Sequence, residues 1–505
     1  MRAFWLKSLP LLLLLAANPV LGGDRYKPDW QSLATHQNPE WLIDGKFGIY
    51  AHWGVYSVPA HVSEWYGRLM HDRQDPRSAY DFHIKTFGPL DRFGYKDFIS
   101  LFRAEKFNAD EWSDLIQQSG ARYAGIAVIH HDGFALWQSK VNRWNSAEMG
   151  PKRDLYGELV KALRARGLKI VATEHHMRTF NWYLPPDRKS RDELRQAGVD
   201  LFDPKYADFY WNEYTSKKSD FIDQWKAKIQ ELIDTYRPDV LWFDGGDYTS
   251  PEVGGAVLGA LAHYYNHAAE RRVEVEVLNK FAGRKFNFPR EFGILTFEEG
   301  RDRPDLVDRP WIDDQRIGHN AWGYVEGLKI KTPAEIVRGF VDRVSRGGGL
   351  LLSLSPKADG EIPEDQKIVL REMGQWLKVN GEAIYGSRAW DVHAEGSTEK
   401  LTYTDQNGSR RWRFDGCTPE DIRFTVKGRT LYAIALGWPA NGELTIKTLA
   451  KGNAHLPGIA AVTLVGSSTP VKWSETEQGL IVRLPAEKPC KYAYTLKITP
   501  KPLSR

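Results

Sequence analysis

The first 390 residues alternate short, largely apolar runs with longer segments whose apolar residues recur at helical spacing. The apolar runs are Phe47–Ala51, Tyr123–Ile129, Leu168–Thr173, Val240–Phe243, Val273–Leu278, Ile294–Phe297 and Gly349–Leu354. Such runs are typical of parallel strands that are covered on both faces. Helical spacing is found over Asn108–Gln118, Asp154–Arg166 and Phe221–Tyr236. Alternating strands and helices predict an α/β fold with a parallel sheet.

Most of these runs end in polar residues, and the polar ends recur from His52 to Glu298. A (β/α) barrel gathers its functional side chains at the C-terminal ends of many strands, whereas an open doubly wound sheet concentrates them at one switch point. We therefore expect a (β/α)8-like, TIM-type barrel, with the open doubly wound sheet as the alternative.

The pattern changes after Trp390, where helical periodicity ends and short alternating strands with turn signals begin. Strands are expected at Lys400–Thr404, Asp421–Val426, Thr430–Leu436, Glu443–Thr448, Ala461–Val465, Leu480–Leu484 and Ala493–Ile498. This spacing is typical of an antiparallel β-sandwich. We expect a signal peptide over 1–22, a catalytic barrel over 23–387, and a C-terminal β-sandwich over 388–505 that contributes no catalytic residue.

The N-terminal segment has the pattern of a secretory signal peptide. Arg2 and Lys7 are basic, Leu11–Ala17 is apolar, and Val20-Leu21-Gly22 offers small residues near a cleavage point. The apolar run is too short to cross a membrane, and no later segment is long and apolar enough to do so. We therefore expect a secreted or periplasmic protein without a membrane span.

Charge and composition narrow the choice of partner. The 69 basic and 65 acidic residues give a formal net charge of +4, which does not suggest a nucleic-acid partner. The 19 tryptophans are many, and indole faces stack on the C–H faces of sugars, although they also fill large cores. Cys417 and Cys490 are the only cysteines, and two cysteines in a sequence do not establish a disulfide.

The polar groups at the strand ends allow three interpretations. They are His52, Glu64, His130, His131, Glu174, His175, Asp244 and Glu298. A metal site is disfavoured, because neighbours such as His130 and His131 point to opposite faces of an extended segment and no His-Glu-x-x-His pair occurs. No metal or cofactor is therefore expected. A polyol-binding site is the second interpretation, with Trp53, Trp65 and Trp137 as stacking faces.

The third interpretation adds catalysis to sugar binding. Asp244 and Glu298 follow different strands on one barrel face, and glycoside hydrolysis needs such a pair of carboxyl groups. One attacks the anomeric carbon while the other donates a proton to the leaving oxygen, so their environments must separate the two pKa values. A Glu298 that only forms a surface ion pair is the alternative.

Several motifs in this order resemble family 29 of the glycoside hydrolases, the α-L-fucosidases. They are Lys46–Gly54, Ser63–Tyr66, Phe107–Trp112, His130–Phe134, Trp242–Gly245, Ala321–Tyr324, Gly348–Leu352 and Trp376–Tyr385. The resemblance implies a retaining mechanism with Asp244 as nucleophile. It also implies a fucose pocket made of His52, Glu64, Trp65, His130, His131 and Trp322, and His175 would reach the sugar by its position in the same pattern.

The acid/base residue departs from the pattern that many relatives share. Those relatives carry Trp-Glu before the Trp-Gly-Tyr motif, whereas this chain has Pro310–Asp314 there, and Ile129 replaces a Lys before the His-His motif. Some relatives place the acid/base in a Glu-Arg-Gly stretch, which Glu298-Glu299-Gly300 resembles. We assign the role to Glu298, with Glu299 as runner-up and Asp313, expected in a loop, as third. Glu299 should point away from Glu298 if the strand continues.

Together these features predict a secreted, exo-acting, retaining α-L-fucosidase. Its partner would be a fucosylated oligosaccharide or polysaccharide, from which it removes terminal α-L-fucosyl residues through a covalent fucosyl-enzyme. The alternative is a catalytically weak or inactive, lectin-like protein that keeps only the fucose pocket. The missing Trp-Glu pair favours this alternative, and Asp244 favours the enzyme.

Overall fold

The computed structural model describes residues 25–246, 248–282, 285–301, 303, 307–396, 402–404, 410–456 and 458–501. The predicted signal peptide over 1–22 lies outside these residues, so its cleavage and the expected export stay predictions.

Eight parallel strands form a closed barrel. They are β1 (Phe47–Ala51), β2 (Tyr123–Ile129), β3 (Lys169–Glu174), β4 (Val240–Phe243), β5 (Glu276–Ala282), β7 (Ile294–Glu298), β8 (Trp311–Arg316) and β9 (Gly348–Leu354). The barrel closes because β1 pairs with β9 and β4 pairs with β5. The short strand β6 (Lys285–Phe286) adds an antiparallel hairpin to β5. The predicted TIM-type barrel is thus confirmed and the open sheet is excluded.

Side chains alternate between the barrel interior and the surrounding helices. Val240 and Trp242 of β4 join the apolar cluster inside the barrel, whereas Leu241 and Phe243 pack in the outer core. Burial on both faces explains the continuous apolar run, since each large side chain taken from water contributes about 1.5–3 kcal/mol. The same alternation directs the next inward position, Asp244, towards the barrel mouth.

Strand β8 is the element that the hydrophobic pattern does not predict, and the expectation of a loop at Asp313 is wrong. Only Trp311 and Ile312 of this strand are apolar. Its two aspartates are nevertheless buried: Asp313 forms an ion pair with Arg343, and Asp314 accepts a hydrogen bond from Tyr50 at 2.7 Å. In β8, buried polar side chains with hydrogen-bond or ion-pair partners occupy positions that are apolar in an ordinary barrel strand. The sequence of this strand therefore resembles that of a loop.

Helices surround the barrel, and the three predicted ones are confirmed. The longer helices are α5 (Ala109–Gln118), α6 (Leu155–Ala165), α9 (Lys218–Tyr236), α10 (Gly254–Glu270), α11 (Pro333–Ser345) and α12 (Glu364–Asn380). Asn108 caps α5 and Asp154 caps α6 by accepting backbone N–H groups of the first turn. The described parts of the β5–β7 and β7–β8 connections contain no α-helix.

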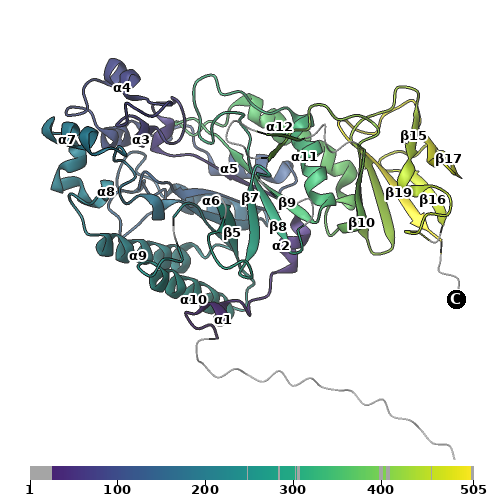
Figure 1. Ribbon diagram of the computed structural model, residues 1–505, viewed down its shortest axis with the longest axis horizontal. Helices are drawn as coiled ribbons and strands as arrows, with labels where there is room; N and C mark the ends of the chain where they lie inside the picture. Colours follow the sequence, from purple (N-terminus) through teal and green to yellow (C-terminus); the bar gives the residue numbers. More distant parts are fainter. Residues whose placement is uncertain are drawn as a thin grey trace, which may run out of the picture.

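Shorter helices occupy the N-terminal lead-in and the connections after β1 and β3. They are α1 (Trp30–Leu33), α2 (Glu40–Gly45), α3 (Tyr66–Leu69), α4 (Tyr80–Phe87), α7 (Arg188–Gln196) and α8 (Ala207–Tyr210). Helices α3, α4, α7 and α8 gather at the end of the molecule that is far from the C-terminal sheets (Figure 1). These insertions leave the C-terminal ends of the strands and build up one side of the barrel mouth.

The C-terminal region consists of antiparallel sheets, as predicted. A five-stranded sheet has the order β10 (Arg388–Glu395), β13 (Ile422–Lys427), β14 (Thr430–Ala435), β19 (Tyr494–Pro500), β16 (Ile459–Leu464). A three-stranded sheet has the order β15 (Glu443–Ile446), β18 (Gly479–Arg483), β17 (Lys472–Thr476), and β11 (Thr402–Thr404) pairs with β12 (Arg410–Trp412). Apolar residues of the two larger sheets share one core cluster.

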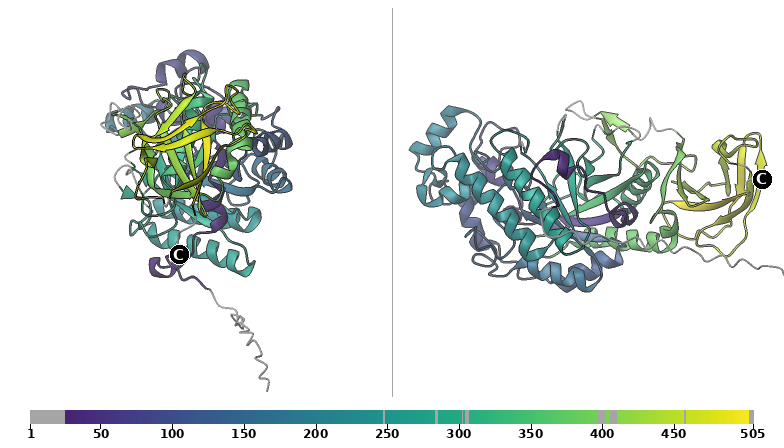
Figure 2. Two further views of the ribbon diagram at one scale, coloured as in Figure 1. Left: turned by 90° about the vertical axis from the view of Figure 1, so that its right-hand side faces the viewer. Right: turned by 90° about the horizontal axis from the view of Figure 1, so that it is seen from below.

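The C-terminal sheets pack directly on helices α11 and α12 (Figure 2). Asp342 of α11 contacts Arg423 of β13 at 2.6 Å, with both side chains about 1% exposed. Trp376 of α12 donates a hydrogen bond to the Ala493 carbonyl at 2.8 Å. Trp412 of β12 also lies against Gly300, just after β7, where a Cβ would come within 2.9 Å of the indole. The exact domain boundary stays a prediction, although β10 begins at Arg388.

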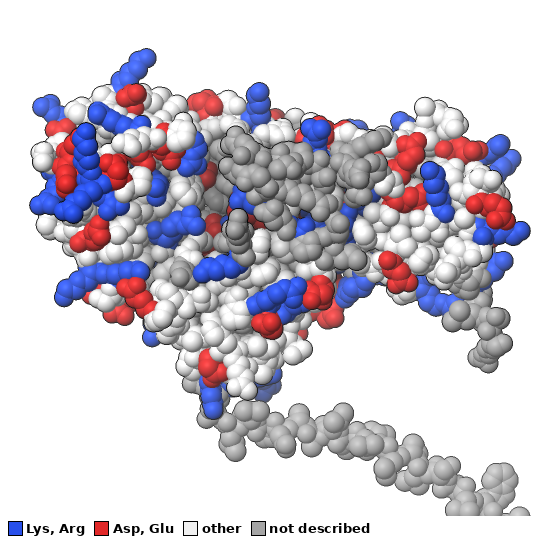
Figure 3. All heavy atoms as spheres, viewed as in Figure 1, with Lys and Arg blue, Asp and Glu red and all other residues white. Residues whose placement is uncertain are grey.

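The surface carries both charge signs. On the face in Figure 3, basic and acidic side chains are interspersed, in agreement with the nearly balanced composition. None of the helices in the described part of the chain is long and apolar enough to span a membrane. Cys417 and Cys490 are free thiols, both partly buried.

Candidate active site

A cavity of about 430 Å³ lies at the C-terminal ends of the barrel strands. It brings together eight of the predicted site residues: His52, Glu64, Trp65, His130, His131, Asp244, Glu298 and Trp322. His175 lies directly beneath its floor, fully buried, with Nδ1 3.8 Å from Asp244 Oδ2. The predicted residues therefore converge on one site, although they come from six strands and the loops that follow them.

Asp244 lies at the floor of this cavity and is held as a carboxylate. Its Oδ1 is 2.7 Å from the Lys280 ammonium, and its backbone N–H donates to the Glu174 carbonyl at 2.8 Å. Burial alone would raise the pKa of Asp244, but Lys280, followed by His175 and His131, outweighs it and holds the pKa well below its usual range. An ionised carboxylate with one oxygen facing His175 rather than a cation suits a nucleophile.

Glu298 ends strand β7 on the same inward side as Ile294. Its Oε2 is 3.1 Å from Lys280 Nζ, and its Oε1 is 3.3 Å from Arg301 Nη2. Lys280 therefore bridges the two carboxylates, Asp244 and Glu298. Its side chain is only 6% exposed, and Asp244, followed by Glu298, raises its pKa above the usual range in spite of burial, so it stays charged.

The two other acid/base candidates do not reach the cavity. Glu299 has a positive φ of 53°, which turns its side chain away to contacts with Lys331 at 2.7 Å and Arg316 at 3.2 Å. Asp313 points outward to Arg343 and accepts the Gly300 N–H at 2.6 Å. Among the three candidates, only Glu298 lines the cavity. Glu299 points away from Glu298, but its positive φ produces this direction rather than the continued strand geometry that was expected.

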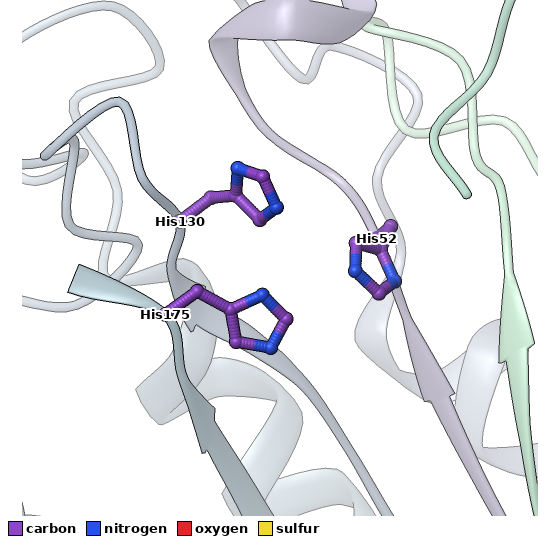
Figure 4. A group of neighbouring side chains, drawn as sticks. All are labelled: His52, His130 and His175. Atoms are coloured by element: carbon purple, nitrogen blue, oxygen red, sulfur yellow. The ribbon is translucent and has the colours of Figure 1, made fainter. Parts of the chain in front are cut away.

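Three histidines from separate strand ends face a common space (Figure 4). Ring nitrogens of His52, His130 and His175 all lie within 4.8 Å of one another. His52 Nδ1 contacts Ser353 Oγ at 2.8 Å, whereas both ring nitrogens of His175 and Nδ1 of His130 have no hydrogen-bond partner among the described residues. Burial lowers the pKa of each ring, to about 4 for His175, so the rings are neutral near pH 7. Neutral imidazoles with unused nitrogens can donate to or accept from sugar hydroxyls.

The expectation that His130 and His131 point to opposite faces is wrong. Both line the cavity, and their ring centroids are 4.4 Å apart. The register of β2 against β3 shifts between Ala127 and Ile129, and the strand ends there, so the alternation of an extended chain does not continue through the pair.

Because His130 and His131 both face the cavity, their order in the sequence no longer argues against a metal site. Local pairs are indeed missing, but His52, His130 and His175 come from three strands and could offer three imidazole ligands to a transition metal. The same nitrogens are equally suited to hydroxyl groups, and the absence of a metal cofactor stays a prediction.

Two indoles and a carboxylate form the sides of the cavity. Glu64 accepts the backbone N–H groups of Trp322 at 3.0 Å and Gly323 at 3.3 Å, which ties the loop after β1 to the loop after β8. The Trp322 ring is 5.1 Å from that of His52, and the half-buried Trp65 meets His131 edge-on at 5.6 Å. The apolar faces of a sugar can stack on such indoles.

Lys280 is the residue that the sequence interpretation missed. It follows Leu278, an interior residue of β5, at the next inward position. The expected strand ended at Leu278, and its polar end, Asn279-Lys280, is visible in the sequence. The rule that singled out Asp244 and Glu298 would have found Lys280 if cations had been counted as well as carboxylates and imidazoles.

The comparisons with known proteins cover almost the whole chain. The family model described as Alpha-L-fucosidase matches residues 13–382, and the one described as Alpha-L-fucosidase C-terminal domain matches residues 415–499. The chain belongs to the α-L-fucosidase family. It is 33% identical to plasma alpha-L-fucosidase of Homo sapiens, over 95% of this chain and 94% of that protein.

Further relatives agree with this assignment. The chain is 32% identical to tissue alpha-L-fucosidase of Homo sapiens, over 99% of both proteins. The crystal structure of Thermotoga maritima alpha-fucosidase in complex with fucose superposes with a TM-score of 0.72 at 29% identity, covering 94% of this chain and 100% of that one. The protein is thus a glycoside hydrolase with α-L-fucosidase activity. The cavity at the barrel mouth is the candidate site of this fucosidase.

Proposed function

We propose that this fucosidase is exo-acting and retaining, with Asp244 as nucleophile and Glu298 as acid/base. The bridge that Lys280 makes between the two carboxylates carries the proposal. Two carboxyl groups that contact one ammonium lie close together, which fits the separation of about 5–5.5 Å in retaining enzymes better than the ~6.5–9.5 Å of inverting ones.

In the first step, Asp244 attacks the anomeric carbon through Oδ2 while Lys280 holds Oδ1. The bond between that carbon and the leaving oxygen breaks, and Glu298 gives its proton to the leaving oxygen. Glu298 is 22% exposed, so it can exchange protons with solvent between turnovers. The product of this step is a covalent fucosyl ester on Asp244.

In the second step, Glu298 takes a proton from a water molecule, which attacks the same carbon and releases Asp244. Esterification has removed the negative charge of Asp244, so the Lys280 ammonium then acts on Glu298 alone. The ammonium thus stays beside the group that accepts the proton from water. One buried cation thereby serves both half-reactions.

In this proposal, the side chains that line the cavity explain why the enzyme binds fucose, and the closed floor explains why the fucose is terminal. We assign hydroxyl recognition to His52, His130, His131 and His175, and the walls to Trp65, Trp322 and Glu64. His175 and the apolar barrel interior lie beneath the floor of the cavity and close it, so a glycan chain cannot pass through. A fucosyl unit would therefore enter as the end of a glycan or polysaccharide.

Export through the predicted signal peptide completes the proposal. The human relative named plasma alpha-L-fucosidase supports a location outside the cytoplasm, in the surroundings of the cell or in a periplasm. The lectin-like alternative depended on the missing Trp-Glu pair. Glu298 contacts Lys280 together with Asp244, so it could replace the Glu of the missing pair as acid/base. Its position supports catalysis over the lectin-like alternative.

The stereochemistry of the product tests the proposal. Proton NMR of an aryl α-L-fucoside digest should show α-L-fucose as the first product, followed by slow mutarotation. Initial release of β-L-fucose would contradict the double displacement. Release of internal oligosaccharides from a fucan, rather than free fucose, would contradict exo action.

A further inference from the structure

Two guanidinium groups lie against the Trp65 wall of the cavity. Arg178 ends the short 3-10 helix His176–Arg178, which follows β3, and its Cζ is 5.5 Å from the Trp65 ring centroid. Arg77, from the insertion after β1, lies 5.6 Å from the same centroid. Both arginines line the cavity and both are exposed.

The Arg178 guanidinium lies close to the reacting centre. Gly245 directly follows Asp244, and a Cβ at Gly245 would come within 2.9 Å of Arg178 Nε and 3.0 Å of His131 Cε1. The positive φ of 65° at Gly245 and this close approach both require glycine there. The pKa of His131 is lowered to about 3, mainly by burial and next by the charge of Arg178. A sugar bound at Asp244 would therefore be within the electrostatic reach of Arg178.

Arg178 differs from the other arginines of the cavity in its pairing. Arg77 contacts Asp75 at 3.2 Å, Arg301 contacts Glu298 at 3.3 Å and Arg316 contacts Glu299 at 3.2 Å. Across the part of the chain that the structure describes, Arg178 forms no ion pair. An exposed, unpaired guanidinium beside a sugar site offers a planar set of donors that matches sulfate or carboxylate oxygens.

The acidic residues of the cavity do not compensate this charge. Asp244 and Glu298 are paired with Lys280 on the floor. Glu64 is buried and accepts two backbone N–H groups, while Asp314 is buried and bonded to Tyr50. Among the described residues that line the cavity, the exposed charges on the Trp65 side are therefore those of Arg178 and Arg77, and only Arg77 has an acidic partner, Asp75.

We propose that the substrates of this fucosidase carry an anionic group, a sulfate ester or a carboxylate, that binds Arg178 with Arg77 beside it. The anion would sit on the fucosyl residue itself or on the sugar next to it. This inference rests on the proposed function, since it requires a fucosyl unit at Asp244. The competing explanation is that both arginines only support the Trp65 indole.

Four matched α-L-fucosides test the inference: a neutral disaccharide, the same disaccharide sulfated on fucose, one sulfated on the adjacent sugar, and one with a uronic acid as the adjacent sugar. For the wild type, kcat/KM should be about three- to tenfold higher on at least one anionic substrate than on the neutral one, the range expected of a partly exposed charge-assisted contact. Added NaCl should reduce this ratio. The substrate that shows it identifies the position of the anion.

Variants locate the anionic contact. Arg178→Gln should bring the anionic-to-neutral ratio close to one, Arg77→Gln should lower it less, and Arg178→Lys should keep part of it. Arg188→Gln is the matched control, because Arg188 on α7 is 90% exposed and does not line the cavity. Its ratio should equal that of the wild type, and thermal melts should show that each variant is folded.

Two results would overturn the inference. One is a wild-type ratio at or below one on all three anionic substrates. The other is an Arg178→Gln variant that loses the same fraction of kcat/KM on every substrate, which would assign Arg178 to the support of Trp65. If no α-L-fucoside at all is hydrolysed with retention, the proposed function fails and this inference falls with it.

Discussion

Two clusters of acids and bases in the described part of the molecule are built for opposite purposes. At the barrel mouth, Asp244, Lys280 and Glu298 are 19%, 6% and 22% exposed, and Asp244 Oδ2 faces a histidine 3.8 Å away. Under the C-terminal sheets, Asp342 and its partners Arg423 and Arg346 are at most 1% exposed, with contacts of 2.6 and 3.1 Å.

The difference lies in what each cluster leaves unused. In both, cations hold the pKa of an aspartate well below its usual range against the effect of burial. The inner cluster uses both oxygens of Asp342 for arginine contacts, so it can only stabilise the fold. The barrel-mouth cluster keeps an oxygen of Asp244 and several imidazole nitrogens free for a ligand. We infer that a cluster can act in catalysis when a carboxylate of low pKa keeps an oxygen free for a ligand. Burial of charged groups alone is not enough.

The largest expected effect is that of Asp244→Ala, which would break the barrel-mouth cluster at its reacting oxygen. Loss of a covalent catalyst should lower kcat on an aryl α-L-fucoside by about 10⁴-fold or more. Azide added to this variant should restore turnover and give a β-L-fucosyl azide. The exposed Asp234→Ala variant, with its carboxylate on the far helix α9, is the control and should retain wild-type kinetics. Near wild-type activity of Asp244→Ala would remove the residue from the role.

Next in size is Glu298→Ala, measured beside Glu299→Ala and Asp313→Ala. Loss of the acid/base should cost about 10²–10⁴-fold on a fucosyl disaccharide but much less on an aryl fucoside with a good leaving group. Only Glu298→Ala should show this split between the two substrates. Asp313→Ala should instead lower Tm, because it leaves Arg343 buried without its partner. A split in Glu299→Ala alone would reassign the acid/base.

Replacing Lys280, which bridges Asp244 and Glu298, tests whether the cation of the barrel-mouth cluster is needed for catalysis. Lys280→Met should lower kcat/KM by about 10²-fold. Lys280 holds the pKa of Asp244 down, so its removal raises that pKa, and the acidic limb of the kcat/KM profile should move to higher pH. The exposed Lys189→Met variant is the control. An unchanged acidic limb in Lys280→Met would show that Lys280 does not govern the ionisation of Asp244.

The smallest effect on catalysis is expected from the inner cluster. Arg423→Met should lower the free energy of unfolding by about 3 kcal/mol while kcat stays close to wild type. The pKa of Asp342 is depressed in the folded state, so this stabilisation is present above its unfolded value of about 3.9 and is lost as pH falls below it. Urea titrations at pH 7 and pH 3 should show a difference from wild type that shrinks at the lower pH.

The control for this variant is Arg429→Met, an exposed arginine of the same sheets. It should unfold like the wild type at both pH values. A loss of kcat in Arg423→Met without a loss of stability would contradict the separation of the two clusters.

Six of the eight barrel strands could be predicted because both of their faces are buried mainly by apolar side chains. For β5 the expected bounds, Val273–Leu278, are shifted from the observed Glu276–Ala282, because Glu276, Asn279 and Lys280 are buried polar residues of that strand. Strand β8 could not be predicted, since Asp313 and Asp314 are buried by partners that lie far away in the sequence, Arg343 and Tyr50. Single-residue alternation placed Glu298 inward because β7 runs to this residue, whereas Glu299 lies beyond the strand and is turned away by its positive φ. It failed at His130 and His131, because the register shift in β2 is set by pairing with β3 and leaves no local signal.

The contact between Gly300 and Trp412 has a consequence for the ancestry and engineering of this enzyme. Gly300 is two residues after Glu298, and its φ of 65° and the indole against it leave no room for a side chain. The C-terminal sheets thus support the loop that follows Glu298, the proposed acid/base, although none of their described residues lines the cavity. We expect this pair of domains to be inherited as a single module. A chimaera that takes its C-terminal domain from another fucosidase should need the segment around Gly300 from the same parent.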